Sequence, residues 1–521
     1  MLSSARHILL CGLSGSGKST AGPRLAQMLG RDFVDLDKEI ETRLGLPTSE
    51  IFAQQGERAF RAAEQMCLAQ CAELAPSVIA LGGGAVASSE GLAQARALGT
   101  LVWLAVPAAR AASRIKQGNR PLLGHGEDAK VARLQGMLDK RVKHYAQADV
   151  VVPVAESPHD TAKRIAQALE DPQIASFVTS HRGTYAVRTA RFSDRGLGEL
   201  LRAHAPRSLV IVADEVLGER AQRVAEHAGA QLVCVQAGER LKRLDAIEAL
   251  ALELSERQAD RHTLIAAIGG GSLTDAVGFV AACYMRGVAW LSVPSTLLGM
   301  VDSGLGGKVG VNAGHAKNLL GAFAPPRAVI ADLSWLDALP ERERRSGSAE
   351  MLKVAATHDA ALFAELSAEL SLPLIARAAA IKAGVVSRDE FEQGERKVLN
   401  FGHTFGHAFE SAAGLSELRH GEAIALGMIA ESEFFAARGQ TNAEVLPALR
   451  GACARLALPQ EWHAWADSAA AFLQHDKKRA GASIRLPVVP QIGRYTWTEA
   501  TLGEMEAFLI ENGLTKRGAQ V

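Results

Sequence analysis

Three histidines lie close together in the C-terminal third of the chain, at His403, His407 and His420. His403 and His407 are four residues apart, so they share one face of a predicted helix. Gly414 is expected to end that helix, and His420 then begins another helix that can fold back toward the first. A single histidine here would more often be a core or surface residue, but the pair within apolar helical sequence favours a metal site.

A possible third ligand lies upstream, in the stretch "SGSAEMLKVA". It places Glu350 and Lys353 on one face of a further helix. A glutamate and two histidines around an open position are a common catalytic zinc set. The residues alone leave open which histidines would be ligands and which would act as acid–base groups.

A second chemical motif lies near the N-terminus. The stretch "GLSGSGKST" fits G-x-x-x-x-G-K-[ST] at Gly12, Gly17, Lys18 and Ser19, between an apolar strand and a helix. The glycines let backbone N–H groups turn toward phosphate oxygens at a helix N-terminus. Lys18 would reach the terminal phosphates and the Ser19 hydroxyl would ligate Mg²⁺. The alternative, a glycine-rich turn that binds nothing, explains these flanks less well.

Several further residues could hold the acceptor of a transferred phosphate. Asp35 and Asp37 lie two apart at a strand end, on the same side, where one could support magnesium and the other an acceptor hydroxyl. Arg61 offers a cation, and the glycine triplet at 82–84 lets a small polar substrate approach the backbone. Arg120 lies in a glycine-flanked stretch with the composition of a mobile lid. Taken singly, each of these signals is weak.

The middle of the chain carries a second set of glycine-rich segments. Gly269 to Gly271 follow an apolar strand and open a helix, which suits a pyrophosphate, although a structural turn is as good an interpretation. Lys308, Lys317 and Asn318 are predicted to lie in glycine-rich loops with Asp302. Cations in such loops suit a phosphorylated, hydroxyl-rich ligand. A merely polar connection would explain the two lysines poorly.

Composition restricts the classes of protein that these residues could serve. The chain has 521 residues, 48% of them hydrophobic, with 57 basic and 57 acidic side chains. Zero formal charge argues against a nucleic-acid or anionic-membrane partner. The six cysteines show no disulfide-like spacing, and no stretch has the length of a membrane span. We therefore expect a soluble, cytoplasmic protein.

Two alternating α/β regions and a helical region must position the candidate residues. Apolar strands alternate with amphipathic helices up to a break at residues 171–173, which predicts a parallel sheet covered on both faces. A second wound sheet begins near residue 177, with a hairpin-like strand in "TYAVRTA". From about residue 340 helical periodicity dominates, and "SIRLPVVPQIGRYTW" is predicted to be a terminal hairpin. The predicted domains are 1–172, 177–340 and 341–521.

In order and spacing, the motifs of about residues 5–170 resemble shikimate kinase. The resemblance implies a three-layer α/β/α P-loop kinase fold that uses ATP with Mg²⁺. It also implies the following roles: ATP contacts from Gly15, Ser16, Gly17, Lys18, Ser19, Thr20 and the lid residue Arg120; Mg²⁺ held by Ser19 and Asp35; the acceptor hydroxyl, and its proton, taken by Asp37; the shikimate carboxylate paired with Arg61 and Arg141; and the ring contacted by Gly83 and Gly84. One departure is the adenine loop near "VAESPHD", which lacks an arginine that some members have.

About residues 177–500 resemble 3-dehydroquinate synthase, through "GGGSLTDAVGF", "VDSGLGGKVGVN", "SAEMLK", "NFGHTFGHAFE" and "RHGEA". This resemblance implies a Rossmann-like NAD-binding subdomain followed by an all-α metal-binding subdomain. Glu350, His403 and His420 would hold Zn²⁺ or Co²⁺, whereas His407 would be an active-site group and not a ligand. Unusual residues occur at Ser272–Thr274, Met300, Gly304 and Ala338, where cofactor affinity could differ.

The same resemblance implies two overlapping sets of ligand contacts. NAD would contact Asp214, Glu239, Lys242, Gly270, Gly271, Asp275, Ser295, Thr296, Asp302, Lys308 and Lys317. The heptulosonate phosphate would contact Arg286, Asp302, Lys308, Asn318, Lys353, Lys382, Arg396, Asn400, His407 and Lys477. The catalytic groups across both halves would be Lys18, Asp37, Arg120, Lys308, Lys353, Arg396, Asn400 and His407.

Together the two resemblances imply a bifunctional enzyme of the shikimate pathway. It would phosphorylate shikimate with ATP and convert 3-deoxy-D-arabino-heptulosonate 7-phosphate to 3-dehydroquinate and phosphate. The two steps are not consecutive, so we expect co-expression in one chain and no channelling, with dimerisation through the C-terminal half. The alternatives are a fusion with a sister cyclase that uses another heptulose phosphate, and a nucleotide-sensing protein with degenerate sites.

Overall fold

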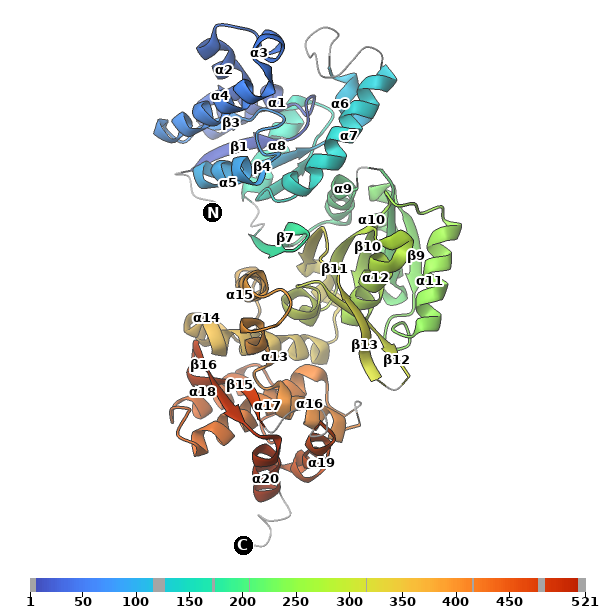
Figure 1. Ribbon diagram of the computed structural model, residues 1–521, viewed down its shortest axis with the longest axis vertical. Coiled ribbons are helices and arrows are strands. Elements are labelled where there is room, and N and C mark those ends of the chain that lie inside the picture. The colour runs from blue at the N-terminus through green and yellow to red at the C-terminus, as the bar shows by residue number, and fades with distance from the viewer. Residues whose placement is uncertain are drawn as a thin grey trace.

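The computed structural model describes residues 6–115, 127–170, 174–205, 207–314, 316–414, 417–476 and 483–513. Figure 1 shows three parts along the long axis: a blue α/β part, a green α/β part, and an orange-to-red helical part that ends near the C-terminus. No helix of these described ranges is both long and apolar enough to cross a membrane.

The first part is a five-stranded parallel sheet with the strand order β2-β3-β1-β4-β5. All five strands lie in the region where the sequence predicted apolar strands that alternate with helices. The strands are β1 (His7–Cys11), β2 (Phe33–Asp35), β3 (Val78–Ala80), β4 (Gly99–Ala105) and β5 (Val150–Pro153). The helices are α1 (Lys18–Leu29), α2 (Leu36–Leu44), α3 (Thr48–Gln54), α4 (Gly56–Gln70), α5 (Ser89–Leu98), α6 (Ala108–Ser113), α7 (Glu127–Tyr145) and α8 (Pro158–Glu170).

The second part is a seven-stranded sheet with the order β6-β7-β14-β11-β10-β8-β9. Only β6 and β7 pair antiparallel, as the hairpin pattern predicted, and the other neighbours are parallel. Its strands are β6 (Ile174–Ser180), β7 (Gly183–Ala190), β8 (Leu209–Asp214), β9 (Gln231–Val235), β10 (Leu264–Gly269), β11 (Ala289–Pro294) and β14 (Ala328–Asp332). Its helices are α9 (Asp194–His204), α10 (Gly218–Ala228), α11 (Leu244–Glu256) and α12 (Gly271–Cys283).

The glycine-rich segment between β11 and β14 differs from the prediction of loops. Asp302 lies in a short π-helical turn, η5 (Gly299–Ser303), and the lysines lie on a two-stranded antiparallel ribbon. The ribbon pairs β12 (Lys308–Ala313) with β13 (Ala316–Phe323). Val309 and Val311 are buried on β12, which packs against α12, so alternate apolar residues allow strand pairing despite the many glycines.

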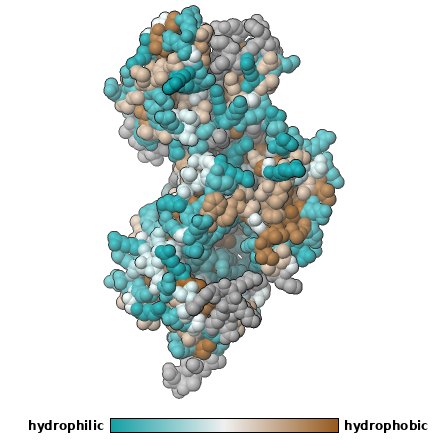
Figure 2. Space-filling view, in the orientation of Figure 1, coloured by the Kyte–Doolittle hydropathy of each residue, from teal (hydrophilic) through white to brown (hydrophobic). Residues whose placement is uncertain are grey.

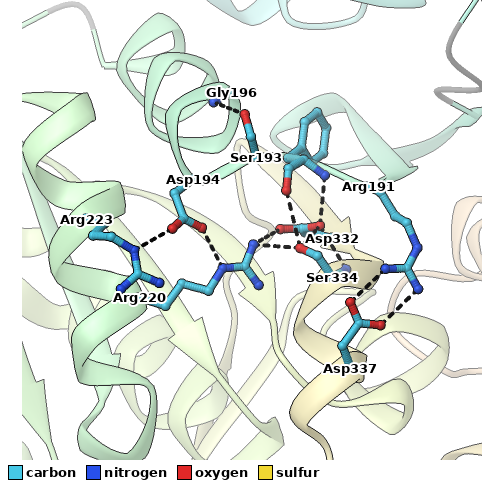
Figure 3. Close-up of polar contacts among 10 residues, drawn as sticks. Arg191, Ser193, Asp194, Gly196, Arg220, Arg223, Asp332, Ser334 and Asp337 are labelled. Atoms are coloured by element: carbon cyan, nitrogen blue, oxygen red, sulfur yellow. Dashed lines mark hydrogen bonds and ion pairs between the residues drawn. The ribbon is translucent and has the colours of Figure 1, made fainter.

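A buried polar network ties the end of β14 to the neighbouring helices (Figure 3). The fully buried Asp332 carboxylate accepts hydrogen bonds from the Phe192 backbone N–H at 3.1 Å and the Ser334 hydroxyl at 2.6 Å, and it pairs with Arg220 at 3.0 Å. Arg220 also pairs with Asp194 at 2.7 Å, which links α10 to the start of α9. Because each charge has a partner, burial at this sheet end is compensated.

The third part is mainly helical and carries the terminal hairpin that the sequence predicted. Its helices are α13 (Glu341–His358), α14 (Ala360–Glu365), α15 (Leu372–Arg388), α16 (His403–Ala412), α17 (His420–Ala437), α18 (Val445–Arg455), α19 (Ala466–Asp476) and α20 (Leu502–Asn512). The hairpin pairs β15 (Ile484–Gln491) with β16 (Arg494–Ala500). The predicted fold class is confirmed, with this hairpin added to the helical subdomain.

Small residues let the central helices approach one another closely. A Cβ atom on Gly427 of α17 would lie 2.0 Å from the Gly402 carbonyl oxygen, just before α16. A Cβ atom on Gly421 would lie 1.9 Å from the Ser346 carbonyl oxygen on α13. Ser346 also accepts a hydrogen bond from the Gly421 N–H at 3.0 Å. Side chains that neighbour these glycines are therefore brought from three helices to one point.

Candidate active sites

The N-terminal motif forms a phosphate-binding loop between β1 and α1. Gly12, Gly15 and Gly17 have φ values of 138°, 82° and 90°, which non-glycine residues rarely adopt. A Cβ atom on Gly15 would lie 2.3 Å from the Ala111 carbonyl oxygen. The Lys18 ammonium donates hydrogen bonds to the carbonyls of Gly12 at 2.9 Å and Leu13 at 3.0 Å. The lysine is thus held inside the loop, at the positive end of α1.

A cavity of about 500 Å³ adjoins this loop. Its lining includes Gly15, Ser16, Gly17, Lys18, Ser19, Thr20, Asp35 and Asp37. The two aspartates do not both belong to the strand end: β2 ends at Asp35, and Asp37 lies in the first turn of α2. Both still face the same cavity, because the helix begins directly after the strand. Carboxylates and a hydroxyl beside a phosphate loop fit a magnesium ion.

The candidate acceptor side lies around the glycine triplet. Arg141 and the Tyr145 hydroxyl both donate to the Gly83 carbonyl, at 2.8 and 2.6 Å. Arg61 pairs with the buried Glu64 at 2.7 Å, and a Cβ atom on Gly84 would lie 2.2 Å from an Arg61 nitrogen. A side chain at position 84 would therefore displace the Arg61 guanidinium from its present place. Arg120 lies outside the described residues.

In the C-terminal half, Glu350, His403 and His420 converge from α13, α16 and α17. Candidate ligand atoms of the three residues all lie within 4.8 Å of one another. His420 Nε2 is 3.3 Å and His403 Nε2 is 3.8 Å from the same Glu350 oxygen. Lys353, one turn along α13, also contacts Glu350. Two imidazole nitrogens and a buried carboxylate form a donor set that fits Zn²⁺ or Co²⁺.

The charges of these groups suit a cation. Burial opposes ionisation of Glu350, but Lys353 and the two imidazoles outweigh it and hold the pKa of the carboxyl well below its usual range. Burial and the Lys353 charge lower the pKa of His403 to about 3, so its ring is neutral. Burial also disfavours the charged form of His420, but hydrogen bonds to Glu350 and Glu410 raise its pKa to about 9. The carboxylate is therefore anionic, His403 is neutral, and His420 carries a proton that a bound metal ion would displace.

His407 lies beside this cluster, with its ring centroid 5.2 Å from that of His403 and 6.0 Å from that of His420. His407, Glu410 and His420 form a second group whose ligand atoms lie within 4.8 Å of one another. That group is more exposed than the first. Glu410 contacts His420 Nδ1 at 3.4 Å, which leaves Nε2 directed at Glu350. A carboxylate behind a metal-binding histidine commonly fixes its orientation in this way.

A cavity of about 520 Å³ adjoins the cluster, between the sheet and the helical part. It brings together nine of the residues that the sequence singled out: Asp275, Asp302, Lys308, Asn318, Lys353, Lys382, Arg396, Asn400 and His403. Lys382 donates to the Asp302 carbonyl at 2.8 Å and also pairs with its carboxylate. Four cationic side chains around one cavity suit a phosphorylated ligand.

Residues predicted to bind a dinucleotide lie next to this cavity. Lys242 pairs with Asp275 at 2.8 Å and contacts Asn318, and Glu239 accepts from Asn312 at 2.8 Å. Gly270 precedes the N-terminus of α12, and a Cβ atom on Gly271 would lie 2.8 Å from the Ser303 hydroxyl. This glycine cradle at a helix N-terminus at the end of β10 fits the pyrophosphate of NAD.

Other predicted contacts do not line the cavity. Asp214 ends β8 and caps the following turn, and Ser295 and Thr296 follow β11. Lys317 and Arg286 are exposed, the first on β13 and the second on the turn η4 (Tyr284–Arg286). Lys477 lies outside the described residues.

Models of known protein families match both the N-terminal and the C-terminal part of the chain. A model of the 3-dehydroquinate synthase N-terminal domain matches residues 232–346, and one of its C-terminal domain matches residues 347–479. The 3-dehydroquinate synthase of Streptococcus pneumoniae (strain ATCC BAA-255 / R6) is 35% identical over 322 residues, which are 59% of this chain and 91% of the relative. That of Nostoc punctiforme is 39% identical over 298 residues, 54% of this chain and 82% of the relative.

The chain belongs to the 3-dehydroquinate synthase family. A shikimate kinase model matches residues 14–170, so the N-terminal part is a shikimate kinase domain. A solved relative is the 2-epi-5-epi-valiolone synthase of Streptomyces hygroscopicus with NAD⁺ and Zn²⁺ bound. It is 29% identical with a TM-score of 0.53 and covers 60% of this chain and 91% of its own.

Some residues of the synthase site were not predicted. Glu392, with a φ of 58°, contacts Lys308 and accepts a hydrogen bond from Asn400 at 2.9 Å. Glu431 accepts from the N–H groups of Gly402 and Thr404, at 2.8 and 3.2 Å, and so supports the start of α16. Neither glutamate has a sequence signal, because each partner lies on a different element. Glu410 could have been suspected from its position one turn after His407.

In the kinase domain, Arg114 was also missed. It follows α6 and donates to the Ala155 carbonyl at 3.0 Å, beside Glu156 in the lining of the nucleotide-side cavity. A guanidinium thus lies against the segment for which the resemblance implies adenine contacts, although that segment itself has no arginine. Only the packing of α6 against residues 154–158 reveals this arrangement.

The unusual residues of the synthase domain have different surroundings. Gly304 leaves no room for a side chain, because a Cβ atom there would lie 2.5 Å from the Gly299 carbonyl oxygen. Met300 is buried in η5, and Ala338 is exposed at the end of η6 (Leu333–Ala338). The unusual glycine at position 304 is therefore explained by the close approach of the backbone at Gly299.

Proposed function

We propose that this bifunctional chain phosphorylates shikimate at the N-terminal site and forms 3-dehydroquinate at the C-terminal site, with the residue roles given below. The observation that carries the synthase assignment is the convergence of Glu350, His403 and His420 beside a cation-lined cavity. For the kinase it is the loop that holds Lys18 at a cavity that Asp35 and Asp37 also line.

In the kinase domain, the backbone N–H groups of the loop and Lys18 bind the phosphates of ATP. Ser19 and Asp35 would hold Mg²⁺, which supplies charge neutralisation for the donor phosphates. Asp37 accepts the proton of the attacking shikimate hydroxyl. Arg61 and Arg141 pair with the shikimate carboxylate, since a guanidinium matches a carboxylate with two parallel hydrogen bonds.

In the synthase domain, Glu350, His403 and His420 would hold the metal, and the α12 N-terminus with Gly270 and Gly271 would hold NAD. When bound, the metal supplies Lewis acidity toward a substrate oxygen, and NAD supplies a reversible hydride acceptor. Substrate contacts come from Lys308, Lys353, Lys382, Arg396, Asn400 and His407.

The cavity residues position the heptulosonate phosphate for elimination. Lys308 and Arg396 lie at the cavity with Asn400, where they bind the phosphate and stabilise its negative charge as it leaves. Lys353 is buried beside Glu350 and Asp302, so it fixes both carboxylates and offers a cation to the substrate oxygens. We propose the domain bounds 1–172 for the kinase, and 177–340 and 341–521 for the two subdomains whose residues together line the synthase cavity.

Two assays on the whole protein test the proposal. Phosphate release from 3-deoxyheptulosonate 7-phosphate is expected to require metal and to stop with a chelator. Shikimate-dependent formation of ADP is expected to continue with NAD absent. Sedoheptulose 7-phosphate as the preferred substrate would reassign the C-terminal half to a sister cyclase. No turnover of either sugar phosphate by the metal-loaded protein would refute the synthase role.

The synthase reaction is expected to lose efficiency above about pH 8. Burial lowers the pKa of Lys308 to about 8, helped by the charges of Arg396 and Lys382. Because the lowered pKa removes the ammonium charge as pH rises, kcat/KM should fall by about tenfold per pH unit above the inflection. The Lys308→Arg variant stays charged, so its profile should lack this inflection; an identical profile in both proteins would contradict the role of Lys308.

We also propose that the chain forms a homodimer through its synthase domain. Apolar residues gather over α11 and the β12–β13 ribbon (Figure 2), and Leu252 on α11 is 58% exposed. Leu252→Arg should shift the dimer to a monomer in analytical ultracentrifugation, because a charge in an apolar interface is costly. Met66→Arg, at a 52% exposed position in the kinase domain, is the control and should leave the dimer intact. A monomeric wild-type chain would exclude the proposal.

A further inference from the structure

The two catalytic parts meet where β7 of the synthase domain lies beneath the kinase domain (Figure 1). Arg188 on β7 is fully buried at this junction. Its guanidinium donates three hydrogen bonds into the kinase domain, to the carbonyls of Ala146 at 2.8 Å, Ala148 at 2.6 Å and Asp149 at 2.9 Å. A single side chain from one enzyme therefore binds three backbone carbonyls within residues 146–149 of the other.

Those residues connect the end of α7 to β5, and α7 carries part of the candidate shikimate site. Tyr145, the last residue of α7, donates to the Gly83 carbonyl at 2.6 Å, and Arg141, one turn earlier, donates to the same oxygen at 2.8 Å. The Arg188 contacts begin at the residue directly after Tyr145. A shift of this connection would therefore move both donors away from Gly83.

A second contact from the synthase domain reaches the same place. The ring of His204, on α9, meets Trp103 edge-on with centroids 5.9 Å apart, and Trp103 packs on Tyr145 at 5.8 Å. His204 is fully buried, and neither ring nitrogen has a hydrogen-bond partner among the described residues. Burial lowers its pKa well below the usual value, so the ring is neutral and packs as an apolar group.

The physical character of the Arg188 contact suits a positioning role. A guanidinium donates from a rigid planar fork, so three short bonds fix the carbonyls in direction as well as distance. Removing it would leave three carbonyl groups at a buried junction without this donor. Such a loss changes the geometry of the connection and also lowers stability.

We propose that Arg188 of the synthase domain is a positioning residue for the shikimate site of the kinase domain. It acts through the Ala146–Asp149 connection, which sets Tyr145 and Arg141 against Gly83. This inference rests on the proposed role of Gly83 and Arg141 in acceptor binding. It makes the kinase acceptor site dependent on the second enzyme, although the two sites share no lining residue.

The test is steady-state kinetics of the full chain with Arg188→Met. We expect the KM for shikimate to rise on the order of tenfold, while the KM for ATP and the synthase kcat stay within about twofold. Glu199→Gln is the matched control, because Glu199 pairs across the same junction with Arg164 at 3.0 Å and so anchors a different element, α8. It should lower the melting temperature without raising the KM for shikimate.

Arg188→Lys keeps the charge but not the fork, so its KM for shikimate should lie between those of the wild type and Arg188→Met. In the wild-type chain, shikimate should slow amide hydrogen exchange in peptides that cover residues 146–149 and β7, because the coupling is reciprocal. Because this measurement uses the wild-type chain, it tests the inference even if a variant fails to fold.

Unchanged exchange in both peptides, or equal rises of the two KM values in Arg188→Met, would overturn the inference. A wild-type chain that does not phosphorylate shikimate would instead refute the proposed kinase function, so the two failures are distinguishable.

Discussion

The His403→Ala variant is expected to lose 3-dehydroquinate synthase activity on the order of a thousandfold, while shikimate kinase turnover stays within about twofold. His403 contributes a neutral imidazole 3.8 Å from Glu350, so its loss leaves two of the three proposed protein ligands for the metal. Weaker metal binding would also leave the buried Glu350 carboxylate with less compensating charge. Phosphate release and metal content, measured on the same preparation, check the expectation.

His407→Ala is the matched control, because His407 lies four residues further along the same helix. It should retain one metal ion per chain and lose activity through its substrate contacts. The opposite pattern, with metal lost in His407→Ala and retained in His403→Ala, would place the ion in the His407, Glu410 and His420 group. That result would contradict the ligand set proposed above.

The second large effect is expected from Lys18→Met in the kinase domain. Shikimate kinase kcat should fall on the order of a thousandfold, because the methionine keeps the length but removes the charge that stabilises the transferring phosphate. Synthase activity should stay within about twofold, since Lys18 lines only the N-terminal cavity of the two. A coupled assay of ADP formation measures the change.

Lys38→Met controls for the loss of a lysine near the site, because Lys38 is exposed on α2 next to Asp37. Its kinase activity should be close to that of the wild type. Thermal unfolding of both variants separates loss of chemistry from loss of fold. A Lys18→Met protein that still transfers phosphate at the wild-type rate would exclude this loop as the donor site.

The sequence by itself determined the features that depend on neighbouring residues. The phosphate loop needs only consecutive glycines, a lysine and a helix start, so Gly12 to Ser19 could be assigned without any partner. The five strands of the first sheet followed from short apolar runs, and the shared face of His403 and His407 followed from helical spacing. The two family resemblances rest on such local motifs, and they predicted the activities and the cofactors.

For some residues, the tertiary structure changed the type of element that the sequence had predicted. Lys308 and Asn318 were expected in loops, whereas pairing across the β12–β13 ribbon places both at the cavity. Asp37 was placed with Asp35 at a strand end, but it lies in a helix that keeps the same direction. In each case the local composition was compatible with two structures, and packing against α12 for the ribbon or against α4 for the helix selected one.

Only the tertiary structure decided which distant residues meet. His403 and His420 lie 53 and 70 positions after Glu350 in the sequence, yet both approach the same Glu350 oxygen. This convergence depends on Gly421 and Gly427, which allow α13, α16 and α17 to approach closely. Glu392, Glu431 and Arg188 likewise act on partners in other elements. Such contacts produce no periodic pattern in the sequence, because they arise where the buried surfaces of separate elements fit together. Sequence periodicity predicts the individual helices and strands, but not which of them pack against one another.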